Sequence, residues 1–285
     1  MIRNSEIYIC CLFLTCSLAS CKTDNQNKDA VNTSDSVNIT KTPVVSNSSG
    51  KFDMVISDIP FPFEILDNLY TNNIPFNQKV MNDIENSSKY NQYNSKALNL
   101  GIYGADLSYT VTYEQFQQIG SYVKNTKKLA DDLNIPFAFD NDMMDKYNKY
   151  KDNKDSLTRI VYDSYNQVDK ALKNDERVGI AALVVTGSWL EGLYLSTKTY
   201  EDSPKTPENS KLYKVIGEQK QSLIVVIKLL EEYKKDPYIS NLINDLKDIT
   251  SEYSLINSNN VMNEAQLVLI NTKVEKLRTK IINGQ

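Results

Sequence analysis

VGIAALVVTGSWLEGLYL, residues 178–195, is the most apolar stretch outside the extreme N-terminus. Its leucines point in several directions, so a helix formed by it is apolar nearly all round and belongs in the middle of a bundle or in a membrane. The polar residues Thr186 and Glu191 favour a buried helix over a membrane span. One stripe of this helix carries small side chains at helical spacing, namely Ala181, Val185, Ser188 and Gly192.

Apolar residues recur at helical spacing through most of the remaining chain, and no stretch alternates at period two for long. A second face of small side chains, at Gly101, Ala105 and Ser108, is expected to pack on the stripe of 178–195. The pattern predicts an all-α fold, an antiparallel multi-helix bundle of about seven or eight helices in one domain over 51–285. A short helix at 61–70 is expected to cap the bundle, and the other expected helices span 87–109, 112–133, 138–151, 155–172, 178–195, 212–230, 239–256 and 267–281.

Composition excludes several classes of chemistry. The chain of 285 residues has a net charge of −4 and no long basic block, so a nucleic-acid partner is not expected. Histidine is absent, which removes the commonest general base and metal ligand. All four cysteines lie in the first 21 residues, so the predicted domain has neither a disulfide nor a thiolate nucleophile. No cofactor is predicted.

An acidic segment from Asp140 to Asp145 invites a calcium interpretation. A calcium loop of the helix-loop-helix type needs a glycine at its sixth position, which Asp145 occupies here. Negative charge near the start of a helix explains the same residues more simply. The sequence therefore predicts a solvated helix start and no metal site.

The N-terminus has the organisation of a secretory signal. Residues 1–20 contain Arg3 and an apolar segment, and Leu18-Ala19-Ser20-Cys21 resembles the lipobox of bacterial lipoproteins. The resemblance implies that Cys21 becomes the first residue of the mature protein and carries fatty acyl groups such as palmitate, which hold it on a membrane. A soluble secreted protein or a plain membrane anchor is the alternative. Residues 21–50 are polar and read as a flexible tether.

The start of the tether, Cys21-Lys22-Thr23-Asp24, is loosely similar to the signal that sends lipoproteins of Bacteroidetes-type bacteria to the cell surface. The predicted location is therefore the bacterial cell envelope, at the outer membrane, on either its periplasmic face or the cell surface. Asp35-Ser36-Val37 also resembles the O-glycosylation acceptor of those bacteria.

Polar residues on apolar helices are the candidates for a site. Ser188 lacks the flanking glycine at spacing two that a nucleophile elbow requires, so we interpret it as a packing residue. Buried carboxylates at Asp106 and Glu191 need partners, and Lys220 or Arg159 is expected to supply a counter-charge. They either form a polar layer that fixes helix register or line a small-molecule pocket. The candidate binding residues are Tyr103, Asp106, Tyr109, Trp189, Glu191, Glu218 and Gln219.

Three segments, LNLGIYGADLSY, GSWLEGLYLSTK and IGEQKQSL, are similar to an uncharacterised helical lipoprotein family of Bacteroidetes-type bacteria, over most of 95–250. The resemblance implies an envelope lipoprotein with an all-helical domain and carries no activity. We expect a non-enzymatic lipoprotein whose domain binds an envelope protein or small ligand. The alternative is a tethered hydrolase, acting for example on glycans, that uses paired carboxylates.

Overall fold

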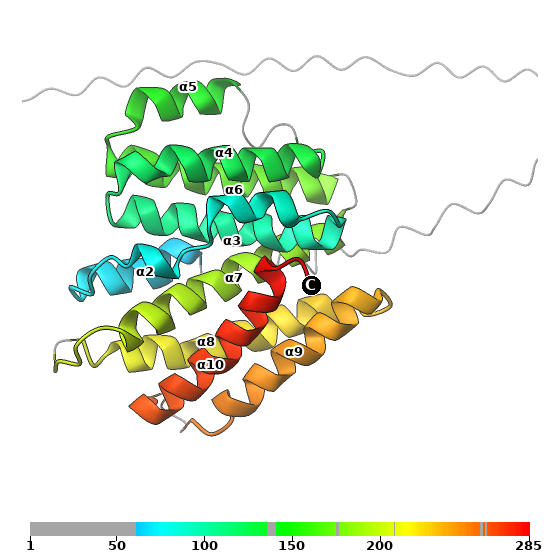
Figure 1. Cartoon of the computed structure of the whole chain (residues 1–285). Coiled ribbons are helices and arrows are strands. Elements are labelled where there is room, and N and C mark those ends of the chain that lie inside the picture. Colours follow the sequence, from blue (N-terminus) through cyan, green and yellow to red (C-terminus); the bar gives the residue numbers. More distant parts are fainter. Residues whose placement is uncertain (1–60, 136–140, 175–176, 208, 257–258, 260) are drawn as a thin grey trace, which may run out of the picture. The chain divides into compact units, whose positions relative to one another are not determined.

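The computed structural model describes residues 61–135, 141–174, 177–207, 209–256, 259 and 261–285. These residues are almost entirely helical and contain no strand, which confirms the all-α prediction (Figure 1). The described residues form nine α-helices and two 3-10 helices, slightly more than the predicted seven or eight helices. The α-helices are α2 (Pro62–Thr71), α3 (Tyr93–Thr112), α4 (Phe116–Asp132), α5 (Asn141–Tyr150), α6 (Lys154–Asn174), α7 (Val178–Glu201), α8 (Leu212–Glu231), α9 (Pro237–Tyr253) and α10 (Glu264–Ile282). The predicted signal peptide, Cys21 and the tether lie outside the described residues.

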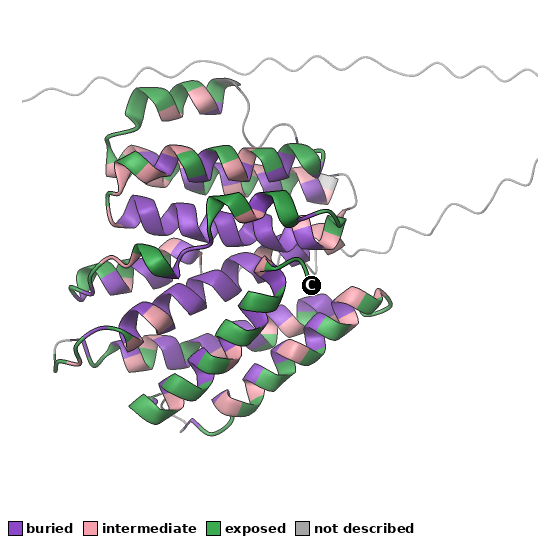
Figure 2. Ribbon diagram, viewed as in Figure 1, coloured by how far each residue is buried: buried purple, intermediate pink, exposed green. Residues whose placement is uncertain are grey.

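The predicted central helix is α7, which begins at Val178 as expected and continues to Glu201. Helix α7 is long and apolar enough to cross a membrane by length and composition. Within the bundle, however, 83% of its most apolar window is buried. Figure 2 shows α3 and α7 as the most continuously buried helices of this unit. Helices α2, α3, α6, α8 and α10 all pack against α7.

Close contact between α3 and α7 depends on two glycines. A Cβ atom on Gly101 would lie 2.0 Å from the Val184 carbonyl oxygen, and one on Gly187 would lie 2.0 Å from the Leu98 carbonyl oxygen. Neither position can hold a larger residue unless the two backbones separate. The small face at Gly101 therefore packs on α7 as predicted. On α7 the contact is made by Gly187, whereas Gly192 faces Pro62 and Ile65 of α2.

The starts of two helices differ from the sequence expectation. Residues Ile84–Lys89 form a 3-10 helix, and α3 begins only at Tyr93, so the expected start at Ser87 is wrong. The side chain of Asn153, and not of Asp155, caps α6, because its oxygen accepts the Ser156 amide at 2.8 Å. Pattern reasoning places the apolar face of a helix well and its ends less well.

Candidate functional site

Glu191 and Arg278 form an ion pair inside the bundle. Glu191 is on α7 and fully buried, and Arg278 is on α10 and 5% exposed. The arginine donates from Nε and Nη2 to the two carboxylate oxygens at 2.6 Å each, which is the strong bidentate geometry. Its Nη2 also donates to the Val80 carbonyl at 3.0 Å, and its guanidinium lies 4.1 Å from the Tyr194 ring centroid. The pair thus joins α7, α10 and the segment before α3.

Asp106 is a second buried carboxyl beside this pair. One of its oxygens accepts the Asn82 backbone amide at 3.2 Å, and the other, Oδ1, has no hydrogen-bond partner among the described residues. Burial and then the negative charge of Glu191 raise the pKa of Asp106 well above its usual value, against the opposing effects of Arg278 and the Asn82 amide. The surroundings of Asp106 therefore favour its protonated form. The cluster places this acid beside the ion pair of Glu191 and Arg278.

The other predicted binding residues do not complete a concave polar site around Asp106 and Glu191. The hydroxyl of Tyr103 donates to the Asp83 carbonyl at 2.7 Å, and that of Tyr109 accepts the Asn77 amide at 3.0 Å. Asp106 and Glu191 have no exposed surface. The cluster is therefore closed to solvent, and it corresponds to the polar layer that the sequence offered as one of two interpretations.

Glu218 and Gln219 differ in their exposure to solvent. Glu218 is exposed on α8, with an oxygen 3.7 Å from Lys214 Nζ. Gln219 is buried and donates to the Val215 carbonyl of its own helix at 3.4 Å. Neither contact connects α8 to the charged cluster.

Arg278 is the partner of Glu191 that sequence reasoning missed. The expected counter-charges were Lys220 and Arg159, but Arg159 is exposed and the ion pair uses Arg278. A signal was present, since Arg278 is four residues after Val274 and stands among the apolar residues of the last predicted helix. An arginine at such a position needs a buried anion.

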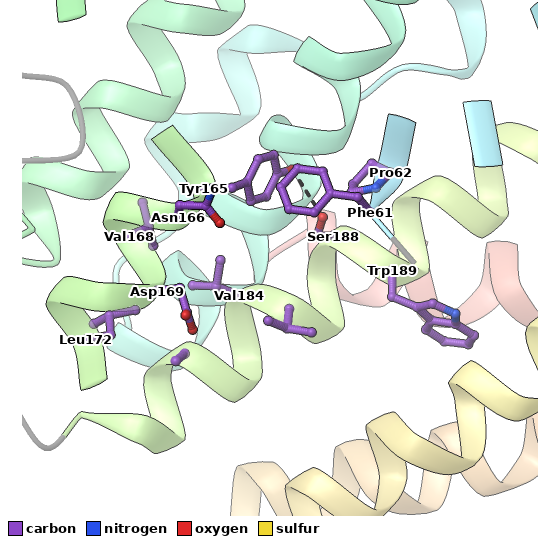
Figure 3. Close-up of a pocket in the computed structure, with 12 residues that line it drawn as sticks. Phe61, Pro62, Tyr165, Asn166, Val168, Asp169, Leu172, Val184, Ser188 and Trp189 are labelled. Carbon is purple, nitrogen blue, oxygen red and sulfur yellow. Dashed lines mark hydrogen bonds between the residues drawn. The ribbon is translucent and has the colours of Figure 1, made fainter. Parts of the chain in front are cut away.

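A cavity of about 100 Å³ lies between α6 and α7 (Figure 3). Its lining is mostly apolar, and it includes three members of the predicted small-residue stripe. Short side chains at these positions leave space that larger ones would fill. The lining residues are Phe61, Pro62, Tyr165, Asn166, Val168, Asp169, Leu172, Ala181, Val184, Val185, Ser188 and Trp189. The stripe therefore lines a cavity in addition to packing against neighbouring helices.

One end of this cavity is closed by aromatic and polar contacts. The Tyr165 hydroxyl and Ser188 Oγ are 3.1 Å apart and share a hydrogen bond, drawn in Figure 3. The Phe61 ring meets the Tyr165 ring edge-to-face, with centroids 4.7 Å apart. The Trp189 ring points away from this pair (Figure 3). At the other end, Asp169 Oδ2 accepts from Lys173 Nζ at 2.5 Å.

The described residues offer little for catalysis or metal binding. No group of Asp and Glu side chains among them is placed to hold a metal ion, and Asp142 pairs with Lys146 at 2.6 Å. Ser188 bonds to a tyrosine hydroxyl and has no general base as its partner. What the arrangement can do is to enclose an apolar group in the α6–α7 cavity.

In comparisons with protein-family models, curated proteins and solved structures, no match to this chain was found. The resemblance to helical lipoproteins stays a prediction. The proposed function therefore depends on the residues of the chain itself.

Proposed function

We propose that the protein is a lipid-anchored lipoprotein of the bacterial cell envelope whose helical domain binds an apolar group of a ligand or partner. The anchor is supported by the apolar segment and by Leu18-Ala19-Ser20-Cys21 at the N-terminus. Acyl chains on Cys21 hold the protein at the outer membrane, and the tether of 21–50 separates the domain from the lipid surface.

The cavity between α6 and α7 carries the binding part of the proposal. Ligand sites are concave and mostly apolar, with a few polar groups that fix orientation. The lining fits this description, because Tyr165 and Ser188 provide hydroxyls in otherwise apolar surroundings. At about 100 Å³, the cavity is smaller than the engineered cavity of about 150 Å³ that binds benzene or xenon. It accommodates one short aliphatic group or one apolar side chain.

A carboxylate-dependent hydrolase receives less support from the geometry. Its two acids would have to flank a substrate with room for a sugar ring and a water molecule. Asp106 and Glu191 do lie close together, but both are fully buried and Glu191 is held by Arg278. The acid in the α6–α7 cavity, Asp169, is paired with Lys173.

The anchor is tested by Cys21→Ala in the native host. The variant should appear in soluble fractions or persist as an uncut precursor, and labelled palmitate should no longer be incorporated. Normal processing together with unchanged membrane retention would contradict the anchor.

The cavity is tested with purified chain 22–285 and xenon or benzene as probes. Thermal unfolding should shift upward with probe concentration, because a ligand that binds the folded state stabilises it. Val185→Trp, which fills the cavity, should abolish the shift. Val268→Trp, at a position 40% exposed on α10, is the matched control and should keep it. An equal shift in both variants would contradict the proposed site.

A further inference from the structure

Two smaller cavities continue from the α6–α7 cavity beneath α6. The middle cavity, about 20 Å³, shares Tyr165, Val168 and Val184 with the first, outer cavity. The inner cavity, about 10 Å³, shares Leu107, Val161 and Ser164 with the middle one. Because neighbouring cavities have walls in common, the three form one row, which we call the α6 row.

The α6 row follows the buried face of a single helix. It extends from Leu172 in the outer cavity to Leu157 in the inner cavity, which corresponds to roughly 22 Å at 1.5 Å per helical residue. The opposite wall changes from α7 to α3 and then to α4 and α5. A row of this shape is long and narrow.

Four hydroxyl groups along the row are already hydrogen-bonded within the protein. Ser164 donates to the Ile160 carbonyl at 2.9 Å, and Thr126 donates to the Tyr122 carbonyl at 2.9 Å. Tyr165 and Ser188 bond to each other. A polar ligand would leave its own groups unpaired here, which is unfavourable. The interior of the row therefore favours an apolar occupant.

Tyr165 separates the outer cavity from the middle one. Its hydroxyl is next to Gly104, where an added Cβ atom would lie 2.3 Å from that oxygen. Gly104 thus makes room for the ring between α3 and α6. A hydrogen bond to Ser188 at 3.1 Å and an edge-to-face contact with Phe61 hold the ring in place. Displacing the ring loses these contacts, on the order of two neutral side-chain interactions, and the burial of an apolar chain offsets that cost.

We propose that the α6 row binds one linear acyl chain, which enters at the outer cavity and displaces the Tyr165 ring to reach the middle and inner cavities. This inference rests on the proposed function and names its ligand class. A compact aromatic ligand or a peptide side chain fills the outer cavity alone, whereas an unbranched chain can extend along the line of shared walls once the Tyr165 ring has moved. At the mouth, Lys173 is already paired with Asp169. The head group of the ligand therefore stays in water and contributes little to affinity.

The experiment measures affinity as a function of chain length. Chain 22–285 lacks the acylated cysteine and can be purified without detergent, which would compete for the site. It contains the whole described core of 61–285. Straight-chain fatty acids from butanoate to hexadecanoate are titrated, with the matching alcohols as a second series. Trp189 is the sole tryptophan and lines the outer cavity, so its emission reports occupancy, and brominated hexadecanoate should quench it.

The expected result is an affinity that rises about fourfold per added methylene as the chain lengthens past the outer cavity. Acids and alcohols of equal length should bind within a few-fold of each other. Ser164→Leu, which fills the junction of the middle and inner cavities, should end the rise at a shorter chain. Lys170→Leu, on the exposed face of the same helix, should leave the series unchanged. Val168→Phe blocks the junction of the outer and middle cavities and serves if Ser164→Leu fails to fold.

Three outcomes would overturn the inference. An affinity that stops rising at butanoate, with xenon or benzene still bound, means that the outer cavity alone is the site, and the proposed function survives. A long series that neither Ser164→Leu nor Val168→Phe shortens places the chain elsewhere on the protein. No binding of any aliphatic probe, of xenon or of benzene removes both the inference and the binding part of the proposed function.

Discussion

Glu191→Gln keeps the shape of the side chain and removes the anion that holds Arg278 in the core. Arg278 donates to both carboxylate oxygens at 2.6 Å and is 5% exposed, so water cannot easily replace the lost partner. Removing one member of a buried pair lowers the free energy of unfolding by about 3–5 kcal/mol, because the remaining charge is uncompensated. For an isolated pair, this would be the expected loss.

Asp106 changes that expectation. Glu191 helps to raise the pKa of Asp106, and Arg278 lowers it. In Glu191→Gln the repulsion is gone and the attraction remains, so the pKa of Asp106 falls and the carboxyl can ionise near the arginine. We therefore expect Glu191→Gln to lose only about 1–3 kcal/mol at neutral pH, because a second acid partly compensates the first.

Asp106→Asn decides between these expectations. In the native background it replaces a buried acid whose charged form is unfavourable, and it should leave stability unchanged or raise it. In the Glu191→Gln background it removes the last anion near Arg278 and should lower the free energy of unfolding by at least about 1 kcal/mol. Urea unfolding of the four proteins, followed by far-ultraviolet circular dichroism, measures both effects. An Asp106→Asn effect of the same sign and size in both backgrounds would refute the reasoning.

Three further predictions use other parts of the structure. Burial raises the folded-state pKa of Asp106 above its usual 3.8, so the contribution of this group to stability is complete below about pH 4 and is lost as pH rises through the folded pKa. The native protein should therefore lose stability relative to Asp106→Asn from about pH 4 upward, by at most about 1.4 kcal/mol per pH unit. Parallel curves of unfolding free energy against pH, measured by urea unfolding, would contradict this. Gly101→Ala forces α3 and α7 apart and should lower the free energy of unfolding by about 1–3 kcal/mol. In Gly192→Ala the new Cβ would meet its nearest neighbour at 3.8 Å, so this variant should instead stabilise α7 by about 0.5–1 kcal/mol. Melting temperatures that shift in the same direction in both variants would argue against the close contact. Asn153→Ala removes the cap of α6 and should lose about 1 kcal/mol, while Asp155→Ala should change stability much less; the reverse order would restore Asp155 as the cap.

Much of the fold could be predicted because helices that pack on a core carry apolar residues at helical spacing in the sequence. Helical spacing is visible in the apolar run of α7, in the small face at Gly101 and in the apolar face of α10. Helix ends depend on local hydrogen bonds that several residues can supply. Asn153 and Asp155 are both good caps, and sequence alone does not decide between them.

The site was less predictable because it depends on how helices meet. Asp106 and Glu191 stood out as polar residues on apolar helices, and the structure brings them together. Their partner is 87 residues further along the chain than Glu191, and no local pattern connects the two. The cavity was hidden for another reason, since small residues at helical spacing indicate either close packing or empty space. The stripe at Ala181, Val185 and Ser188 lines the α6–α7 cavity, although short side chains there first suggested contact.

The position of Arg278 along the chain has a consequence for how the protein matures. A growing chain presents Asp106 and Glu191 long before Arg278, which lies near the end of the last helix. Until that arginine arrives, Glu191 has no cation to accompany it out of water, and the space between α3 and α7 resists closing. Closure of the bundle therefore depends on the final turns of α10. A chain interrupted before Arg278 should stay open and be degraded by proteases that leave the finished domain intact.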